Sequence, residues 1–158
     1  MRTAATGSER SASGLPGPLY CDASGLVKLY VPEADSDELN RTLRGRGDLL
    51  VSDLSITEIV SSLARRRREG ALTAAIAGRL HRAILSHTEK GVYRRVELLP
   101  ATHREAERLL LSAGSVPLRA ADALHLALAV SGDAASVLTY DRRLADAARS
   151  VGLTVFPS

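Results

Sequence analysis

The chain has 158 residues and a mass of 16.8 kDa, which predicts one domain, because a single core usually serves about 100 to 200 residues. Apolar residues make up 45% and charged residues 25%, as in globular proteins, which excludes disorder for the bulk of the chain. The single cysteine, Cys21, excludes an internal disulfide and a thiolate zinc site. No apolar run reaches the roughly 18 residues of a membrane span, and residues 1–17 lack a signal-peptide core. We therefore expect a cytoplasmic protein without membrane contact.

The charge of the chain is compatible with nucleic acid as a partner but does not require one. The formal net charge is +3, the sequence pI is near 9.4, and all 21 basic residues are arginines except Lys28 and Lys90. Four tyrosines and one phenylalanine are too few for the stacking surface of an RNA-recognition sheet. If the chain binds RNA, we expect the contacts to be made mainly to phosphates.

Short apolar runs alternate with helical patterns along most of the chain. Residues 1–18 are rich in Ser, Gly, Ala and Pro, so we expect a disordered extension there and one folded domain over 19–158. In chain order the expected elements are a strand at 19–21, helices at 24–30 and 36–44, a strand at 49–52, helices at 56–68 and 73–88, a strand at 95–99, helices after Thr102 and from near Arg119, a strand at 136–140, a helix at 142–149 and a strand at 153–156. This alternation predicts an α/β fold with a mainly parallel central sheet and helices on both faces.

Two aspartates directly follow expected strands. Asp22 comes after the strand at 19–21, and Asp141 comes after the strand at 136–140. In an open parallel sheet, ligands bind beyond the carboxyl ends of the strands. We therefore expect both side chains at the edge of the sheet where a site would form.

Two further acids lie near the start of expected helices. Glu58 is expected in the opening turn of the helix after the second strand, with Ser55 or Thr57 as its N-cap, and Asp122 in the first turn of the helix near Arg119. Each acid also has a structural interpretation, because acids stabilise helix N-termini and aspartates commonly cap or turn the chain after strands. Both lie in apolar sequence, however, where a carboxylate is expensive to bury.

A convergence of four carboxylates predicts a bound cation. Two carboxylates 4 Å apart repel each other by about 4 kcal/mol at an effective dielectric constant of about 20. Oxygen ligands without a cluster of cysteines or histidines favour a hard ion such as Mg²⁺ or Mn²⁺ over zinc. Metal-assisted phosphoryl chemistry is the most direct use of such a site.

Four segments resemble the PIN domain family, and most closely its VapC-type ribonuclease toxins from bacterial toxin/antitoxin pairs. They occur in family order and the resemblance spans about residues 19–156; the segments read LYCDASGLVKLYVPE, SITEIVSSLARR, RAADALHLALA and LTYDRRLADAA. The resemblance implies a three-layer α/β/α fold and hydrolysis of RNA with Mg²⁺ or Mn²⁺ as cofactor. It also implies a homodimer and an antitoxin protein as partners. The extension at 1–18 departs from the family pattern.

The catalytic acids that the resemblance implies are Asp22, Glu58, Asp122 and Asp141. From the chemistry of the site, we expect Asp22 and Asp122 to bind the metal directly, and Glu58 and Asp141 to bind it directly or through water. Ser24 and Thr139 match family positions that often carry a hydroxyl, and we expect them to hydrogen-bond the carboxylates and hold their rotamers.

Three arginines are candidates for contact with RNA phosphate. Arg65 follows Glu58 by seven residues, about two helical turns, and the other two adjoin the acids in sequence: Arg119 and Arg142. The structural alternatives are a solvated face with a favourable C-terminal charge for Arg65, and simple neutralisation of the acids for the other two.

Other polar residues are expected to be structural. His125 follows Asp122 by three residues in an apolar helix, so we expect it to be packed and hydrogen-bonded. Cys21 is expected to be a buried strand residue. Lys28 is interpreted as a charge partner at the edge of the site, and Glu33 as structural.

The first two helices carry more apolar side chains than a short hairpin needs. We expect these side chains to serve core packing together with a groove for an antitoxin helix or a dimer partner; they are Leu26, Val27, Leu29, Tyr30, Leu39 and Leu43.

Two rival functions stay open: a non-catalytic module that binds RNA or protein, and a housekeeping RNA-processing nuclease without an antitoxin. A dehalogenase-type phosphatase is excluded because Ser24 stands where its second aspartate is required, and a P-loop enzyme because GxxxxGK[ST] does not occur.

Overall fold

The computed structural model describes residues 14–157, and the strands in this range form one parallel sheet. They are β1 (Leu19–Cys21), β2 (Leu49–Ser52), β3 (Arg94–Val96), β4 (Ser136–Leu138) and β5 (Thr154–Phe156). The order across the sheet is β3-β2-β1-β4-β5, and every neighbouring pair is parallel. The predicted mainly parallel sheet is therefore confirmed, with β1 at its centre.

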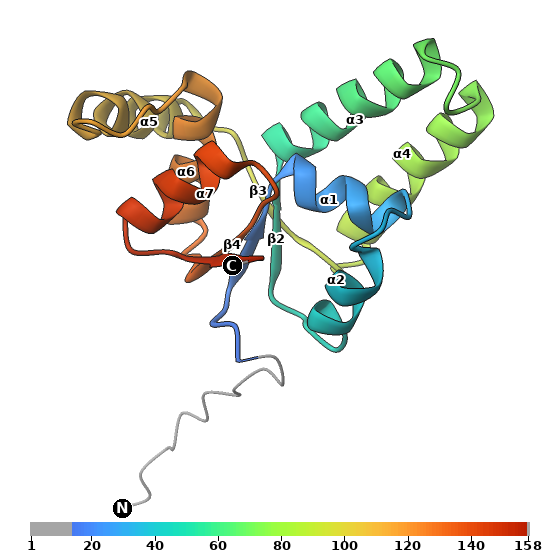
Figure 1. The fold of residues 1–158 in the computed structure, drawn as a ribbon, viewed down its shortest axis with the longest axis horizontal. Coiled ribbons are helices and arrows are strands. Elements are labelled where there is room, and N and C mark those ends of the chain that lie inside the picture. Colours follow the sequence, from blue (N-terminus) through green and yellow to red (C-terminus); the bar gives the residue numbers. More distant parts are fainter. Residues whose placement is uncertain (1–13, 158) are drawn as a thin grey trace, which may run out of the picture.

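Helices cover both faces of the sheet and complete three layers. They are α1 (Ala23–Tyr30), α2 (Ser36–Leu43), α3 (Asp53–Arg68), α4 (Ala74–Glu89), α5 (Pro100–Ser112), α6 (Ala120–Ser131) and α7 (Arg142–Ser150). Figure 1 shows α1 to α4 on one side of the sheet and α5 to α7 on the other. None of the helices in the described range is long and apolar enough to cross a membrane.

Each face of the sheet has its own hydrophobic core. Leu19 and Cys21 of β1 pack with α1 to α4, whereas Tyr20 points to the opposite face and packs with α5, α6 and α7. This alternation follows from the two-residue period of a strand, and a strand covered on both faces reads as an unbroken apolar run. Cys21 is 1% exposed, as expected, and burial raises the pKa of its thiol.

The chain just before β1 also belongs to the folded unit, which differs from the extension expected over 1–18. Leu15 is buried in the core beneath α1 to α4. The Ser136 hydroxyl donates to the carbonyl of Pro16, and the Ala135 amide donates to the carbonyl of Pro18 at 2.9 Å. These bonds prolong the pairing of β1 with β4 and fix residues 15–18. Residues 1–13 lie outside the described range.

Two element boundaries differ from the sequence prediction in ways that move site residues. The α3 helix begins at Asp53, three residues early, because the Ser52 hydroxyl accepts a hydrogen bond from the Ser55 amide at 3.0 Å and caps the helix there. The β4 strand ends at Leu138: the Thr139 amide still donates to the Phe156 carbonyl, but the amides after it bind side chains, Tyr140 N to Ser24 Oγ at 2.7 Å and Asp141 N to Thr139 Oγ1 at 3.0 Å. The third strand covers 94–96 instead of 95–99.

Candidate active site

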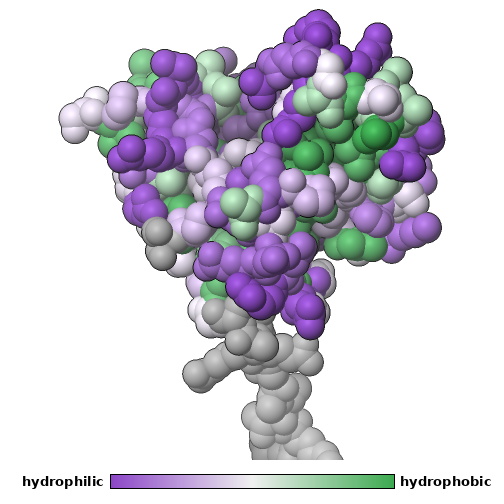
Figure 2. Space-filling view, turned by 45° about the vertical axis from the view of Figure 1, so that its right-hand side comes forward, coloured by the Kyte–Doolittle hydropathy of each residue, from purple (hydrophilic) through white to green (hydrophobic). Residues whose placement is uncertain are grey.

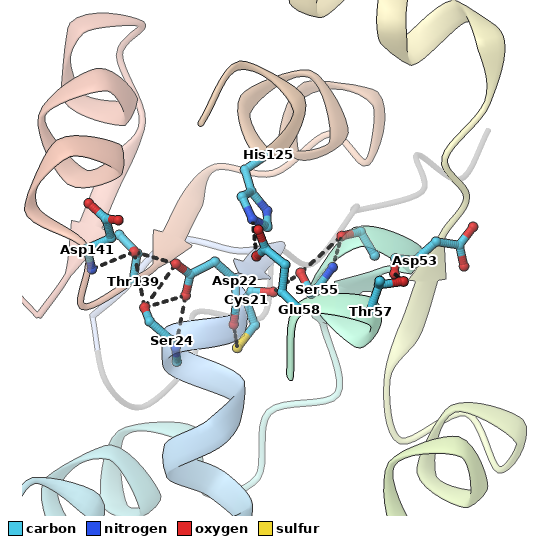
Figure 3. Close-up of polar contacts among 12 residues, drawn as sticks. Cys21, Asp22, Ser24, Asp53, Ser55, Thr57, Glu58, His125, Thr139 and Asp141 are labelled. Carbon is cyan, nitrogen blue, oxygen red and sulfur yellow. Dashed lines mark hydrogen bonds and ion pairs between the residues drawn. The ribbon is translucent and has the colours of Figure 1, made fainter. Parts of the chain in front are cut away.

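Asp22 occupies the position predicted for it, directly after the central strand β1 and at the N-cap of α1. Its Oδ1 accepts hydrogen bonds from the Gly25 amide at 2.9 Å and the Ser24 hydroxyl at 2.8 Å. Its Oδ2 accepts from the Thr139 hydroxyl at 2.6 Å. Figure 3 shows Ser24 and Thr139 converging on the Asp22 carboxylate from two different segments of the chain. The side chain is therefore held in one orientation.

The Asp22 carboxylate carries a charge that the protein itself does not balance. The residue is 4% exposed, and within residues 14–157 it has no salt-bridge partner. Burial raises the pKa of Asp22, while the hydrogen bonds from Thr139, Gly25 and Ser24 and the nearby His125 oppose that rise. Because its fixed partners are neutral donors, the ionised carboxylate is well suited to a cation that binds from outside.

Asp141 is tied to Asp22 through Thr139. The Thr139 hydroxyl donates to Asp22 and accepts from the Asp141 amide at 3.0 Å. The carboxylate of Asp141 caps α7 and accepts from the amides of Arg143 at 2.8 Å and Leu144 at 3.3 Å. Since β4 ends at Leu138, Asp141 does not directly follow the strand as predicted. It lies instead at the start of the next helix and is exposed.

Glu58 lies in the second turn of α3, and the prediction of an opening-turn position was wrong. Ser52, not Ser55 or Thr57, is the N-cap, so the helix starts earlier than its apolar pattern indicates. The Glu58 side chain is 37% exposed, and its Oε2 lies 2.8 Å from Nε2 of His125 on α6. Figure 3 shows Glu58 and His125 meeting beside the Asp22 group.

His125 is packed and hydrogen-bonded, as predicted, but its partners could not be read from the sequence. The residue is 4% exposed; its Nε2 contacts Glu58, 67 positions away, and its Nδ1 lies 2.7 Å from the hydroxyl of Tyr20 on β1. The only sequence signal was its spacing of three from Asp122, which placed both on one helix face.

Asp122 lies in the first turn of α6, where it was predicted. It is 7% exposed, and its Oδ2 accepts a hydrogen bond from the Arg119 amide at 3.1 Å. No salt bridge reaches it from the described part of the chain. Like Asp22, it is a buried carboxylate with neutral partners.

Three of the four predicted acids belong to two bonded groups, and the fourth, Asp122, is bonded to the Arg119 amide and not to either group. One group joins Asp22 to Asp141 through Thr139, and the other joins Glu58 to His125. Among residues 14–157, no three or more His, Cys, Asp and Glu side chains lie close enough to hold a metal ion by themselves. The donor chemistry nevertheless fits a hard divalent ion, because the available atoms are carboxylate oxygens and the buried Asp22 carboxylate forms no salt bridge with another residue of 14–157.

The arginines singled out from the sequence are accessible. All three are exposed, and none forms a salt bridge with another described residue: Arg65, Arg119 and Arg142. Arg142 follows Asp141 directly and lines an open cavity of about 330 Å³ together with Thr139, Tyr140 and Arg149. A cavity of this size beside the acids is large enough for a nucleotide.

Lys28 and Glu33 form a charged group at the edge of this region. Lys28 Nζ lies 2.8 Å from Glu33 and 4.5 Å from the centre of the Tyr140 ring. Glu33 also pairs with Arg66 at 2.7 Å, so its structural interpretation is consistent with its contacts. The hydrogen bonds from Lys28 and Arg66, together with the positive charges of these two side chains, hold the pKa of Glu33 below its ordinary range.

The fold and the acids beyond β1 and β2 define an α/β protein with a polar site at the carboxyl edge of a parallel sheet. The PIN domain family model matches residues 19–150, and the chain therefore belongs to the PIN domain family.

Relatives in Mycobacterium tuberculosis confirm the VapC-type resemblance. Ribonuclease VapC46 is 35% identical over 141 residues, covering 87% of this chain and 95% of the relative. Ribonuclease VapC45 is 33% identical over 142 residues, covering 89% of this chain and 95% of the relative. Ribonuclease VapC47 is 30% identical, covering 85% and 92%.

Two solved structures confirm the fold. M. tuberculosis VapC20, described as a Sarcin-Ricin loop cleaving toxin, has a TM-score of 0.65 and 17% identity, covering 82% of this chain and 95% of that chain. The PAE2754 protein of Pyrobaculum aerophilum has a TM-score of 0.62 and 24% identity, covering 87% and 82%. At these identities the likeness concerns the fold alone.

Proposed function

We propose that this protein is a metal-dependent endoribonuclease that hydrolyses phosphodiester bonds of RNA in the cytoplasm, and that it is the toxin of a toxin/antitoxin pair. Membership of the PIN domain family and the relatives named Ribonuclease VapC support this proposal. The observation that carries it is Asp22, a buried carboxylate beyond the central strand, held by neutral donors and without a salt bridge to any other described residue. Such a carboxylate is suited to bind a divalent ion, and a divalent ion is suited to bind the negatively charged phosphodiester of RNA.

Asp22 and Asp122 are the proposed direct ligands of Mg²⁺ or Mn²⁺, and Glu58 and Asp141 the proposed ligands that act directly or through water. When bound, the ion supplies positive charge at the scissile phosphate and lowers the pKa of water. Ser24 and Thr139 hold the Asp22 oxygens in place. Ordered carboxylates avoid a rearrangement when the substrate arrives, which favours catalysis.

Glu58 and the exposed arginines have the proposed tasks of handling the nucleophile and the strand. Glu58 uses Oε2 for His125, so its Oε1 stays available to orient the attacking water and to take its proton. The arginines bind phosphates on either side of the bond that is cut: Arg65, Arg119 and Arg142. The cavity of about 330 Å³ beside Arg142 accepts a flanking nucleotide.

An antitoxin and a second copy of the chain are the proposed protein partners. Figure 2 shows hydrophobic surface on the side that carries the α3 and α4 hairpin, bordered by hydrophilic residues. Among the apolar side chains of α1, Leu26 and Val27 are buried in the core, whereas Leu29 and Tyr30 are half-buried. The half-buried ones support the proposed groove for an amphipathic partner segment.

The deciding experiment is cleavage of total RNA, including tRNA, by purified antitoxin-free protein with Mg²⁺ or Mn²⁺, with EDTA as the metal-free control. We expect discrete fragments with either metal and none with EDTA. Asp22→Asn removes the charge but keeps the shape, so we expect a folded protein that does not cut. Asp37→Asn on α2, an exposed acid outside the site, should cut like wild type. If Asp22→Asn cuts at the wild-type rate, the proposed site is wrong, and if no metal supports cutting, the non-catalytic module replaces this proposal.

A further inference from the structure

A chain of hydrogen bonds connects Glu58 with the interior of the protein. Glu58 Oε2 lies 2.8 Å from His125 Nε2, and His125 Nδ1 lies 2.7 Å from the Tyr20 hydroxyl. The Tyr20 hydroxyl in turn lies 2.8 Å from Ser52 Oγ. Tyr20 and Ser52 are fully buried and His125 is nearly so, whereas Glu58 is partly exposed. The exposed carboxylate is thus attached to a rigid, buried row of polar groups drawn from β1, β2 and α6.

The outer end of the chain fixes the direction of its protons, because the Glu58 carboxylate only accepts hydrogen bonds and His125 Nε2 must therefore donate to it. The Ser55 hydroxyl donates to the Cys21 carbonyl at 2.9 Å, and the Ser55 amide donates to Ser52 Oγ at 3.0 Å. The Ser52 hydroxyl lies 2.8 Å from the Tyr20 oxygen and 3.0 Å from Ser55 Oγ, so it can donate to either one. The Tyr20 hydroxyl has one proton, and it donates to Nδ1 of His125 when the proton of the neutral ring is on Nε2.

This order of protons leaves one arrangement for a neutral His125. With Nδ1 as acceptor, the ring proton is on Nε2 and points at Glu58 Oε2. The opposite tautomer would direct the Nε2 lone pair at a carboxylate oxygen, and the two would repel. A doubly protonated ring would also donate from Nε2, so the contact with Glu58 does not depend on the charge of the ring.

We propose that His125 is a positioning residue for Glu58, which it holds by one oxygen so that the other faces the substrate. Oε1 has no hydrogen-bond partner among residues 14–157. Without the Nε2 donor, a partly exposed glutamate would sample several rotamers. The inference rests on the proposed function, because it gives Glu58 a fixed geometry for the ribonuclease reaction.

Two substitutions separate the contact with Glu58 from the contact with Tyr20. In His125→Gln the amide nitrogen reaches the place of Nε2 and can still donate to Glu58. In His125→Asn the shorter amide reaches the place of Nδ1, so it keeps a partner for Tyr20 but loses the donor to Glu58. A positioning role predicts kcat about 10- to 100-fold lower in His125→Asn and largely restored in His125→Gln. KM should stay within about twofold of wild type in both, because a buried residue does not touch RNA.

A different result is expected if His125 only stabilises the fold. A merely structural role predicts that kcat follows thermal stability, with His125→Gln the more damaged variant because it gives up the contact with Tyr20. His87→Asn is the matched control, since the half-buried His87 makes the same kind of contact on the other face of the sheet, with its Nδ1 2.6 Å from the Tyr30 hydroxyl. It should leave kcat unchanged.

A measurement without metal or RNA tests the geometry itself. In a ¹⁵N-labelled, metal-free protein, NMR distinguishes the two ring nitrogens of each of the four histidines, and His125→Gln identifies the signals of His125. We expect the proton on Nε2, with slow exchange in wild type and faster exchange in Glu58→Ala. A proton on Nδ1 alone would overturn the inference. If wild type cuts no RNA, the proposed function fails, and this spectrum still decides whether His125 holds Glu58.

Discussion

Asp22 and Glu58 follow neighbouring strands of the same sheet, yet the protein holds the two carboxylates in opposite ways. Asp22 is buried, and its two oxygens accept from hydroxyls and an amide of α1 and the β4–α7 connection. Glu58 is partly exposed, and among residues 14–157 its side chain has one hydrogen bond, from the buried His125. An unbalanced buried charge with fixed geometry is suited to hold a cation. A carboxylate with one oxygen fixed and one free is suited to orient water and accept a proton.

The largest difference between the two carboxylates should come from removing the Thr139 hydroxyl, because this change affects the contacts of Asp22 and leaves those of Glu58 intact. Thr139→Val keeps the shape of the side chain but deletes the donor to Asp22 Oδ2 and the acceptor of the Asp141 amide. We expect RNA cleavage to fall about 10- to 100-fold and the free energy of unfolding to fall by about 1–3 kcal/mol for the unsatisfied amide.

Single-turnover cleavage and thermal unfolding check this prediction. Thr139→Ser restores the hydroxyl and should recover most of both losses. The NMR signals of His125 should not move, because the Glu58 side of the site is left intact. Wild-type cleavage by Thr139→Val would show that Asp22 needs no support from the β4–α7 connection.

Much of the fold could be predicted because strand and helix patterns are local. Burial on both faces makes strands such as β1 and β2 continuous apolar runs, and their alternation with helices predicts parallel pairing. The start of α3 was missed because the cap is Ser52, itself a strand residue, while the apolar pattern begins only at Ile56. Leu15 was assigned to the extension because its partners are distant in sequence, in the core beneath α1 to α4.

The candidate site was predicted residue by residue but not as a network. Asp22 and Asp122 stand at the element ends that local signals indicate. The bond from Thr139 to a carboxylate was expected from the family resemblance and is present, with Asp22 as its partner across 117 positions. The bond from His125 to Glu58 spans 67 positions and was missed, because no local pattern encodes such a pair. These contacts depend on the order of strands in the sheet, which alternation alone does not determine.

A smaller effect is expected on thermal stability, where the Tm of Asp22→Asn can be compared with that of Glu58→Gln. Without metal, the buried Asp22 charge opposes folding at neutral pH, so Asp22→Asn should have a higher Tm than wild type, by a few degrees at roughly 2–4 °C per kcal/mol. Glu58→Gln, whose side chain is partly exposed, should change Tm less. Mn²⁺ should raise the Tm of wild type and not that of Asp22→Asn, because binding to the folded state stabilises it.

The pH dependence of this difference follows from the sign of the shift. Burial raises the pKa of folded Asp22, so the folded protein binds this proton more tightly than the unfolded chain does. Stability from this group is therefore lost as pH rises through the folded pKa, and is regained on acidification until the pH reaches the unfolded value, about 3.9. The Tm advantage of Asp22→Asn in EDTA should shrink as pH falls. An advantage that grows in acid would contradict the assignment.

The smallest effects are expected from substitutions of single arginines. These substitutions test whether the RNA strand runs past Asp22, past Glu58 or past both. Arg142 adjoins Asp141 on the Asp22 side, and Arg65 lies two turns beyond Glu58 on α3. Each phosphate contact adds about 0.7 to the slope of log affinity against log salt for single-stranded RNA. Binding of RNA by Asp22→Asn protein in EDTA measures that slope without cleavage.

Arg142→Ala and Arg65→Ala are each added to the Asp22→Asn protein, and each should lower the slope by about 0.7. Arg108→Ala is the control, because Arg108 is paired with Glu105 on α5, and it should leave the slope unchanged. A change in Arg142→Ala alone would place the strand along the Asp22 side, and no change in either would remove both arginines from the RNA path.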